Sequence, residues 1–327
     1  MRFLFRTDCH LADNSPQSWK GDYIQECLSN IQQTGELAAR HEVTAVLDGG
    51  DFFHVKTPSR NSHRLVALTA KYHASYPCPV FSVPGNHDIA HNNLESVSGQ
   101  PLGVLYETGV FKRLHDEVFE EGDLRVRVVG LPFSPTRTLE DVRRVLKQPG
   151  DSHLILVMHA LAGRNPPDKL EDFFGEPVFR YEDLIFEGGP DIWCFGHWHK
   201  DQGLEEIAGR WFVNQGAVSR GALSKDNLDR IPKVALLRIT RNSLSVVSIP
   251  LKVLPSAEVF DLARKEQQEA KSEAIDKFVS ELYHSFVKDL VGGEGEDSSV
   301  EDMINQLDFA ADVRALALSY LEKTTPK

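Results

Sequence analysis

The sequence predicts an α/β fold in which two mixed sheets lie face to face, with helices on the outside. One observation behind this is that short apolar runs alternate with amphipathic stretches over the first 250 residues, as in α/β domains. A second is that polar residues able to bind metal ions follow the ends of several apolar runs. With 327 residues, the chain has room for about two domains, or for one large domain and an appendage.

Nine apolar runs are expected to be strands. Six of them alternate with the amphipathic stretches, and these are Arg2–Arg6, Val43–Leu47, Pro79–Val83, Arg125–Gly130, His153–Met158 and Asp191–Phe195. Three later runs are expected to be antiparallel strands, and these are Trp211–Asn214, Pro232–Thr240 and Ser243–Pro250. The last two are joined by a turn at Arg241-Asn242. Together the runs predict one domain over residues 1–254.

Residues 255–327 differ in character and are expected to form a helical appendage. Apolar residues recur at helical spacing after Ser256, and a second such run begins at Val300. Between the two runs, residues 292–299 are typical of a flexible acidic linker. We therefore expect a helix–linker–helix segment, which either docks on a partner protein or packs back on the first domain.

The charge of the chain is uneven and excludes no class of partner. The net charge is -12, but residues 256–327 hold 8 basic and 16 acidic side chains, so the first 255 residues carry only -4. Two bound divalent cations would offset that remainder, and DNA therefore stays possible as a substrate.

Compartment and membrane contact are inferred from apolar runs and cysteines. No apolar run approaches the ~20 residues of a membrane span, and the apolar start reaches Asp8 too soon for a signal peptide. The 4 cysteines stand singly and indicate neither a disulfide framework nor a zinc finger. We expect a cytoplasmic protein without a membrane partner.

The strongest signal is a set of five short motifs that run in order down the chain. They are Asp8-Cys9-His10, Gly50-Asp51, Gly85-Asn86-His87-Asp88, His159 and Gly196-His197-Trp198-His199. Each follows a predicted strand, and open α/β sheets bind their ligands at the carboxyl ends of strands. The seven candidate metal ligands are Asp8, His10, Asp51, Asn86, His159, His197 and His199. The opposing interpretation, turn residues and packed histidines, would require all five motifs to coincide by chance.

These ligand types predict two transition-metal ions side by side. Imidazole and carboxylate donors without thiolate favour manganese, iron, cobalt or zinc over magnesium and calcium. Asp51 is the candidate bridge, because a carboxylate can give one oxygen to each ion. Asn86 adds a neutral oxygen, which leaves the site able to accept an anionic phosphodiester. Such a pair of ions activates water as hydroxide at neutral pH, and the reaction indicated is in-line hydrolysis of a phosphate ester.

Three further residues are candidates for catalysis beside the metal ions. His87 follows the ligand Asn86 directly and, backed by Asp88, is suited to orient the phosphate or protonate the leaving oxygen. His54 lies three residues after Asp51 and is expected to make a second phosphate contact. The candidate contacts to a DNA backbone are basic residues in or near the motif loops: Lys56, Arg60, Arg64, Arg164 and Arg220.

The ordered motifs resemble those of the calcineurin-like metallophosphoesterase superfamily over about residues 1–250. The closer resemblance is to its DNA-repair nuclease branch, the SbcD/Mre-type subunits. It is carried by the stretch from Gly50 to Ser59 (GDFFHVKTPS) and by the stretch from Phe212 to Arg220 (FVNQGAVSR), in which Gln215 replaces the usual proline. The resemblance implies a four-layer α/β/β/α sandwich.

The resemblance also implies roles for the motif residues. One metal ion would take Asp8, His10, Asp51 and His199 as ligands, and the second would take Asp51, Asn86, His159 and His197. In the family the ions are usually manganese. The residue at the position of His87 contacts the scissile phosphate, and the residue at the position of His54 helps to engage it.

Partners are implied by the same resemblance. Members of this branch cut DNA in repair, recombination or replication, form homodimers, and dock C-terminal helices on a coiled-coil ATPase of the SbcC/Rad type. Residues 255–327 fit that docking role. Because no DNA-capping domain follows the Ser243–Pro250 strand, the chain resembles compact bacteriophage subunits, which work in the cytoplasm of a bacterium or infected cell.

Two other functions stay open at this point. The first is a phosphodiesterase acting on cyclic nucleotides or other small molecules, since one fold and one pair of metals serve many substrates. The second is a scaffold that binds DNA or an ATPase without cutting. All seven candidate ligands are present, which argues against the scaffold, and the Asp51–Ser59 stretch and helical tail argue against the small-molecule enzyme.

Overall fold

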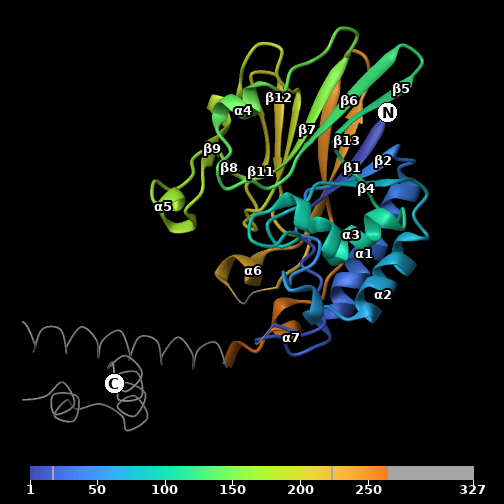
Figure 1. The fold of residues 1–327 in the computed structure, drawn as a ribbon, viewed down its shortest axis with the longest axis vertical. Helices are drawn as coiled ribbons and strands as arrows, with labels where there is room; N and C mark the ends of the chain where they lie inside the picture. The colour runs from blue at the N-terminus through green and yellow to red at the C-terminus, as the bar shows by residue number, and fades with distance from the viewer. Residues whose placement is uncertain (17, 222–223, 264–327) are drawn as a thin grey trace, which may run out of the picture. The chain divides into compact units, whose positions relative to one another are not determined.

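The computed structural model describes residues 1–16, 18–221 and 224–263 (Figure 1). Residues 264–327, which hold most of the predicted appendage, lie outside the described residues. The chain divides into two compact units, Met1–Phe260 and Asp261–Lys327, and every strand described below belongs to the first. The predicted boundary between residues 254 and 255 stays a prediction.

Two six-stranded mixed sheets form the centre of the unit. The first has the order β14-β13-β1-β2-β3-β4, with β1 (Arg2–Arg6), β2 (Ala45–Asp48), β3 (Val80–Ser82), β4 (Lys112–Arg113), β13 (Lys233–Ile239) and β14 (Leu244–Pro250). The second has the order β11-β12-β10-β7-β6-β5, with β5 (Asp116–Glu121), β6 (Leu124–Leu131), β7 (His153–His159), β10 (Ile192–Gly196), β11 (Gly203–Ile207) and β12 (Arg210–Asn214). A separate parallel pair consists of β8 (Leu161–Gly163) and β9 (Val178–Arg180). In the first sheet β1, β2 and β3 are parallel to one another, and β13 is antiparallel to β1. In the second sheet β6, β7 and β10 are parallel.

The main hydrophobic core lies between the two large sheets. Strands alternate their side chains, so every second residue of an inner strand faces the other sheet. Phe5 and Leu47 from the first sheet pack in one cluster with Val157 and Cys194 from the second, and all four are almost fully buried. The inner strands are therefore fixed against one another, and so are the loops at their carboxyl ends.

Helices cover the outer faces of both sheets (Figure 1). Beside the first sheet lie α1 (Tyr23–Arg40), α2 (His63–His73) and α3 (Pro101–Glu107), of which the first two begin at side-chain caps supplied by Asp22 and Ser62. The second sheet is covered more thinly, by α4 (Leu139–Arg143) and the 3₁₀ turn η3 (Tyr181–Leu184), which pack on its buried aromatic residues. The predicted arrangement of two mixed sheets flanked by helices is confirmed.

Short helices and turns occupy the connections. They are the 3₁₀ turns η1 (Pro58–Arg60) and η2 (Leu94–Gly99) and the helices α5 (Leu170–Phe174), α6 (Lys225–Asp229) and α7 (Ser256–Val259). No helix among the described residues is both long and apolar enough to cross a membrane.

All nine predicted strands are present, and their ends differ from the predictions by no more than two residues. One pairing differs, because the Trp211–Asn214 strand is antiparallel to β11 but parallel to β10. Within the described part of the chain, five strands were not predicted: β4, β5, β8, β9 and β11. Of these, β4 (KR), β5 (DEVFEE) and β11 (GLEEI) are sheet edges, and their short or polar sequences carry little strand signal.

Candidate metal centre

The motif loops converge because they follow parallel strands in the middle of both sheets. The loop after β1 carries Asp8 and His10, the loop after β2 carries Asp51, and the loop after β3 carries Asn86. From the second sheet, His159 ends β7, and the loop after β10 carries His197 and His199. The side chains of these loops meet in two clusters that share Asp51.

The first cluster consists of Asp8, His10, Asp51 and His199, whose ligand atoms all lie within 4.8 Å of one another. His10 Nε2 is 2.8 Å from His199 Nε2, and both imidazoles approach the Asp8 carboxylate, at 3.7 and 3.6 Å. Burial opposes ionisation of Asp8, but hydrogen bonds from the two imidazoles outweigh it and hold the pKa of this carboxyl well below its usual range.

The second cluster consists of Asp51, His159 and His197, with ligand atoms again within 4.8 Å. Asn86 joins it, because its Oδ1 lies 3.2 Å from His159 Nε2. The Nδ1–H of His159 donates to the carbonyl oxygen of Gly49 at 2.7 Å, so Nε2 is the nitrogen that faces Asp51 and Asn86 and could bind a metal ion. A carbonyl on the far nitrogen is a common way to fix the tautomer of a metal-binding histidine.

Asp51 is the residue that fits a bridging position. Its Oδ1 accepts the backbone N–H of His87 at 2.7 Å, whereas its buried Oδ2 accepts no hydrogen bond from the described residues. That free oxygen lies 3.4 Å from His159 Nε2 and 3.6 Å from His10 Nε2, one in each cluster. Burial raises the pKa of Asp51, but the charge of His159 and the neighbouring imidazoles outweigh it and lower the pKa below its usual range. A buried, unpartnered carboxylate oxygen between two sets of nitrogen donors fits a pair of cations.

The backbone is strained at the ligands. Asp8, His10, Asp51 and His197 adopt φ values of 55°, 45°, 53° and 94°, a left-handed conformation that costs side chains other than glycine about 1–3 kcal/mol each. Hydrogen bonds hold it in place, since the N–H groups of Asp8 and His10 donate to the carbonyl oxygens of Gly50 and Asp51. This backbone conformation turns the four side chains toward one another at the carboxyl ends of the strands.

Asp88 was expected to back the imidazole of His87, but its carboxylate binds backbone N–H groups of the ligand loops. Its carboxylate accepts backbone N–H groups from Asp51 at 2.7 Å, Gly85 at 2.9 Å and Phe52 at 3.4 Å, and so ties the loop after β2 to the loop after β3. Burial and the charge of Asp51 raise the pKa of Asp88 to about 8. Gly85 permits this approach, because a Cβ there would lie 2.1 Å from Asp51 Oδ1. Asp88 therefore positions the ligand loops through their backbone N–H groups.

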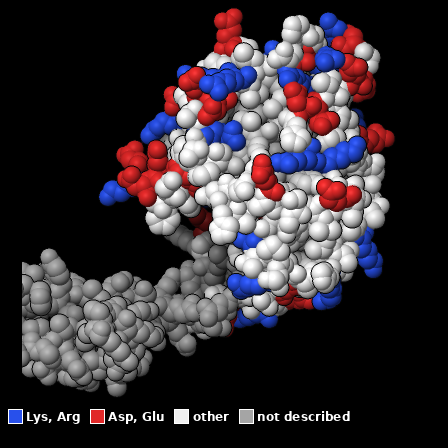
Figure 2. All heavy atoms as spheres, in the orientation of Figure 1, with Lys and Arg blue, Asp and Glu red and all other residues white. Residues whose placement is uncertain are grey.

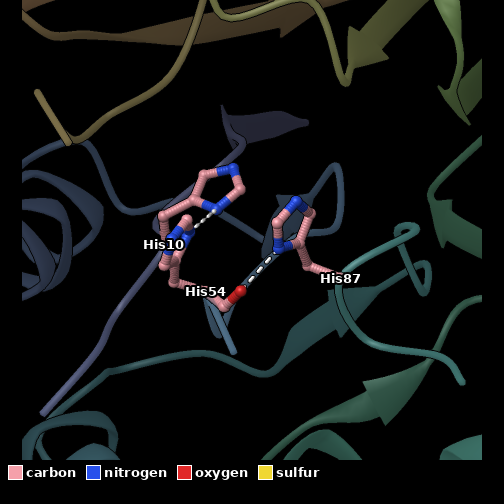
Figure 3. Close-up of side chains that lie close together, drawn as sticks. All are labelled: His10, His54 and His87. Atoms are coloured by element: carbon pink, nitrogen blue, oxygen red, sulfur yellow. Dashed lines mark hydrogen bonds between the residues drawn. The ribbon is translucent and has the colours of Figure 1, made fainter. Parts of the chain in front are cut away.

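His54 and His87 lie together beside His10, a candidate ligand of the first cluster (Figure 3), and His54 is exposed. His87 Nδ1 is 2.5 Å from the carbonyl oxygen of His54, and the two rings stack with centroids 5.2 Å apart. His54 Nδ1 is in turn 3.2 Å from Nδ1 of the ligand His10. The two predicted phosphate-contacting histidines are thus neighbours, next to a candidate ligand.

A cavity of about 570 Å³ opens over the second cluster. Its lining includes Asp51, Asn86, His87 and His197. Lys56 and the aromatic ring of Phe174 line the same cavity. Its size and lining are suited to a phosphorylated group with an aromatic ring beside it.

The other basic residues predicted to contact DNA have different settings. Arg60 and Arg64 are exposed on η1 and α2, whereas exposed Arg164 donates to Glu205 at 2.9 Å. Arg220 is buried, and the prediction for it is wrong: its guanidinium bonds both carboxylate oxygens of Glu26, at 2.9 and 3.0 Å. A buried cation tied to a carboxylate cannot reach a DNA backbone.

One residue of the centre escaped sequence reasoning altogether. Glu176, which follows α5, places its Oε1 2.6 Å from Nε2 of His197. Glu176 belongs to no motif and lies in a segment without strand periodicity, so no pattern in the sequence ties it to the histidine.

Residues 1–201 match the family described as Calcineurin-like phosphoesterase. The Double-strand break repair protein MRE11 of Encephalitozoon cuniculi (strain GB-M1) is 26% identical over 228 residues, and the match covers 58% of this chain and 38% of that protein. The chain therefore spans about two fifths of the length of this relative.

Two solved structures are also similar. The first is described as a novel archaeal phosphodiesterase, with 15% identity, a TM-score of 0.36, and coverage of 76% of this chain and 100% of that chain. The second is the protein TT1561 of Thermus thermophilus, with 14% identity, a TM-score of 0.44, and coverage of 76% and 98%.

Proposed function

Because the chain belongs to the calcineurin-like phosphoesterase family and is therefore a hydrolase, we propose that it cuts the phosphodiester bonds of DNA as an exonuclease and endonuclease. The observation that carries the proposal is the buried, unpartnered Oδ2 of Asp51 between two groups of metal-binding side chains. The 26% identical repair protein supports DNA as the substrate over the aligned 58% of this chain.

Two divalent ions are part of the proposal. Asp8, His10, Asp51 and His199 would hold the first, and Asp51, Asn86, His159 and His197 would hold the second. Manganese is the proposed ion, and the same donors also suit iron, cobalt and zinc and, less well, magnesium. When bound, such a pair lowers the pKa of a water molecule and neutralises charge on a phosphate.

The chain's own residues would then orient the phosphate and move a proton. His87 and His54 are next to the candidate ligand His10, within reach of a phosphate over the clusters. We propose that His87 contacts the scissile phosphate or protonates the leaving oxygen, and that His54 assists by holding the phosphate. Asp88 contributes indirectly, because it fixes the two loops that present Asp51, Asn86 and His87.

Recognition of a nucleotide is supported by the cavity lining. Lys56 can pair with a backbone phosphate, and the half-exposed ring of Phe174 offers a surface for stacking a base. On the face shown in Figure 2, basic and acidic side chains are interspersed, and acidic ones gather over the projecting α5. At that side of the cavity, stacking of a base on Phe174 would therefore contribute more to nucleotide binding than attraction between charges.

The remaining parts of the proposal concern partners. We propose that the chain is the nuclease subunit of a complex with an SbcC/Rad-type ATPase, contacted through residues 255–327, and that it forms a homodimer. It would work in DNA repair, recombination or replication in the cytoplasm. The support for these parts is the motif resemblance and the similarity to a double-strand break repair protein.

End-labelled linear duplex and single-stranded DNA, incubated with the purified chain with and without Mn²⁺, test the proposal. Asp51→Ala is the loss-of-function variant, and Asp172→Ala, which removes an exposed carboxylate on α5, is the matched control. We expect the wild type and the Asp172→Ala control to cut DNA when Mn²⁺ is present, and Asp51→Ala not to cut it. Hydrolysis of bis-p-nitrophenyl phosphate without any DNA cutting would instead favour a small-molecule phosphodiesterase.

A further inference from the structure

We infer that Glu176 is a positioning residue for the second metal ion, because it fixes the His197 imidazole in the one tautomer that can bind a metal through Nδ1. The inference rests on the proposed dinuclear centre and extends it to a residue outside the motifs. The observation behind it is a single short contact between two nearly buried side chains.

The contact has the geometry of a strong hydrogen bond. Glu176 Oε1 lies 2.6 Å from His197 Nε2, and the two side chains are only 10% and 8% exposed. A carboxylate so placed accepts the Nε2–H of the imidazole, and hydrogen bonds to an ionised acceptor are roughly twice as strong as neutral ones. Because little water competes at this burial, the bond is a fixed part of the site and differs from a surface ion pair.

The bond determines which nitrogen of His197 is free. A neutral imidazole has one N–H and one lone pair, so donation from Nε2 leaves the lone pair on Nδ1. His159, the other histidine of this cluster, is held in the opposite tautomer by the Gly49 carbonyl. The two histidines of the second cluster are thus oriented through different nitrogens, His159 by a neutral acceptor and His197 by a charged one.

The ring of His197 has little other freedom. It contacts the rings of Phe133 and Phe174, with ring centroids 5.5 and 6.2 Å away. Its backbone is fixed by a φ of 94° and by an N–H that donates to the Asp8 carboxylate. What packing leaves undecided is which ring nitrogen carries the proton, and Glu176 is the group that decides it.

The position of Glu176 follows from the end of α5. Gly175 ends the helix with a φ of 68°, and its N–H donates to the carbonyl oxygen of Glu171 at 2.7 Å. This left-handed turn directs the next residue back toward the centre. The nearly buried carboxylate of Glu176 has no Lys or Arg side chain as a partner among the described residues, and a cation bound at His197 would compensate its charge.

Metal binding by the full chain tests the inference without relying on activity. Mn²⁺ is titrated into metal-free protein, with free Mn²⁺ followed by electron paramagnetic resonance and heat by calorimetry. The variants are Glu176→Ala and Glu176→Gln, and Glu171→Ala, which removes an exposed carboxylate from the preceding helix α5, is the matched control. Co²⁺ absorption spectra give a second readout, because they report the donors around the ion.

We expect the wild type and Glu171→Ala to bind two ions alike. Glu176→Ala should weaken one of the two by about 10–100-fold, the usual effect of removing a partner of a metal-binding histidine, and leave the other unchanged. Glu176→Gln should lie between them, because the amide oxygen still accepts the bond but carries no charge. The Co²⁺ spectrum of Glu176→Ala should change for that one ion alone.

Two results would overturn the inference, and they are distinguishable. If Glu176→Ala and Glu176→Gln bind both ions as the wild type does, Glu176 has no positioning role while the proposed centre stands. If the wild type itself fails to bind two ions, the proposed centre is wrong and the inference fails with it. Because Glu176→Gln preserves size and a hydrogen-bond acceptor, it covers the case in which Glu176→Ala does not fold.

Discussion

At the scale of single residues, a substitution of His87 tests catalysis independently of metal binding. Its ring contacts the carbonyl oxygen of His54, and its side chain is absent from both ligand clusters that share Asp51. We predict that His87→Ala lowers the rate of DNA cleavage by about 10²–10⁴-fold, the usual contribution of a proton-transferring side chain, while two Mn²⁺ ions still bind. Single-turnover cleavage and Mn²⁺ titration of the same preparation check this, and cleavage at the wild-type rate would contradict it.

His73 gives a prediction on pH, away from the metal ligands. It is buried, with Nε2 2.8 Å from Arg6 and Nδ1 2.8 Å from the carbonyl oxygen of Thr69. Burial and the charge of Arg6 lower its pKa well below the ordinary 6.5. As the pH falls below 6.5, the unfolded chain takes up a proton at His73 that the folded chain does not, so stability is lost on acidification.

The change that tests this is His73→Gln, which removes the titration but keeps a donor and an acceptor. We expect the free energy of unfolding of the wild type to fall more steeply than that of the variant between pH 6.5 and 5.5, by up to about 1.4 kcal/mol per pH unit. Urea unfolding at several pH values measures the difference. Parallel curves would show that His73 takes up its proton equally in the folded and unfolded chain.

The residues of the centre differ in how far sequence predicts them. Asp8, Asp51 and His159 could be predicted because each ends or follows an apolar strand, and parallel strands place their carboxyl ends together. Glu176 could not be predicted, because a hydrogen bond between residues 176 and 197 leaves no periodic signal in the sequence. Arg220 was misjudged because a basic residue in a motif loop looks the same whether it is exposed or paired with a buried carboxylate.

At the scale of elements, the loops and edges are what the sequence predicts least well. The apolar periodicity of inner strands follows from burial on both faces, so the runs that became β1 and β7 were found with nearly correct ends. The left-handed backbone of the ligand loops depends instead on hydrogen bonds between loops of different strands, such as the N–H of His10 to the carbonyl oxygen of Asp51. Such contacts exist only once the sheet has formed.

Arg220 also makes contacts between segments that are far apart in the sequence. Besides Glu26, its guanidinium donates to the carbonyl oxygen of Leu254 at 2.8 Å and lies 5.9 Å from the ring centres of Trp19 and Phe260. Arg220 thereby links the segment that holds Leu254 and Phe260 to Trp19, which precedes α1.

We predict that Arg220→Ala lowers the free energy of unfolding by about 3–5 kcal/mol, because Glu26 is left with an unpaired, nearly buried charge. The salt dependence of DNA binding by the folded variant should not change.

Lys56→Ala should have the opposite effects. Its stability should be unchanged, and the slope of log affinity against log salt concentration should be reduced by about 0.9. Urea unfolding and binding titrations at several salt concentrations check both, and a reduced salt slope in Arg220→Ala would restore it as a DNA contact.

At the scale of the whole molecule, the candidate ligands come from both sheets. Asp8, Asp51 and Asn86 follow strands of the first sheet, while His159 and His197 belong to the second. The sheets are otherwise joined by the core between them, which is built from apolar side chains of both. Metal ions bound across the two clusters would therefore connect the sheets at one edge, and their binding free energy would add to the stability of the whole domain.

We predict that Mn²⁺ raises the free energy of unfolding by about 2.7 kcal/mol for each ion present at 100 times its dissociation constant, provided that it binds only the folded chain. Asp51→Asn should lose most of this gain, because it removes the charge shared by both clusters. Since the chain carries a net charge of -12, any cation also relieves some repulsion. Na⁺ at equal ionic strength and the exposed Asp172→Asn variant control for that general effect. Thermal unfolding against Mn²⁺ concentration measures the gain, and an equal shift in Asp51→Asn and the wild type would mean that the ions bind elsewhere on the acidic surface.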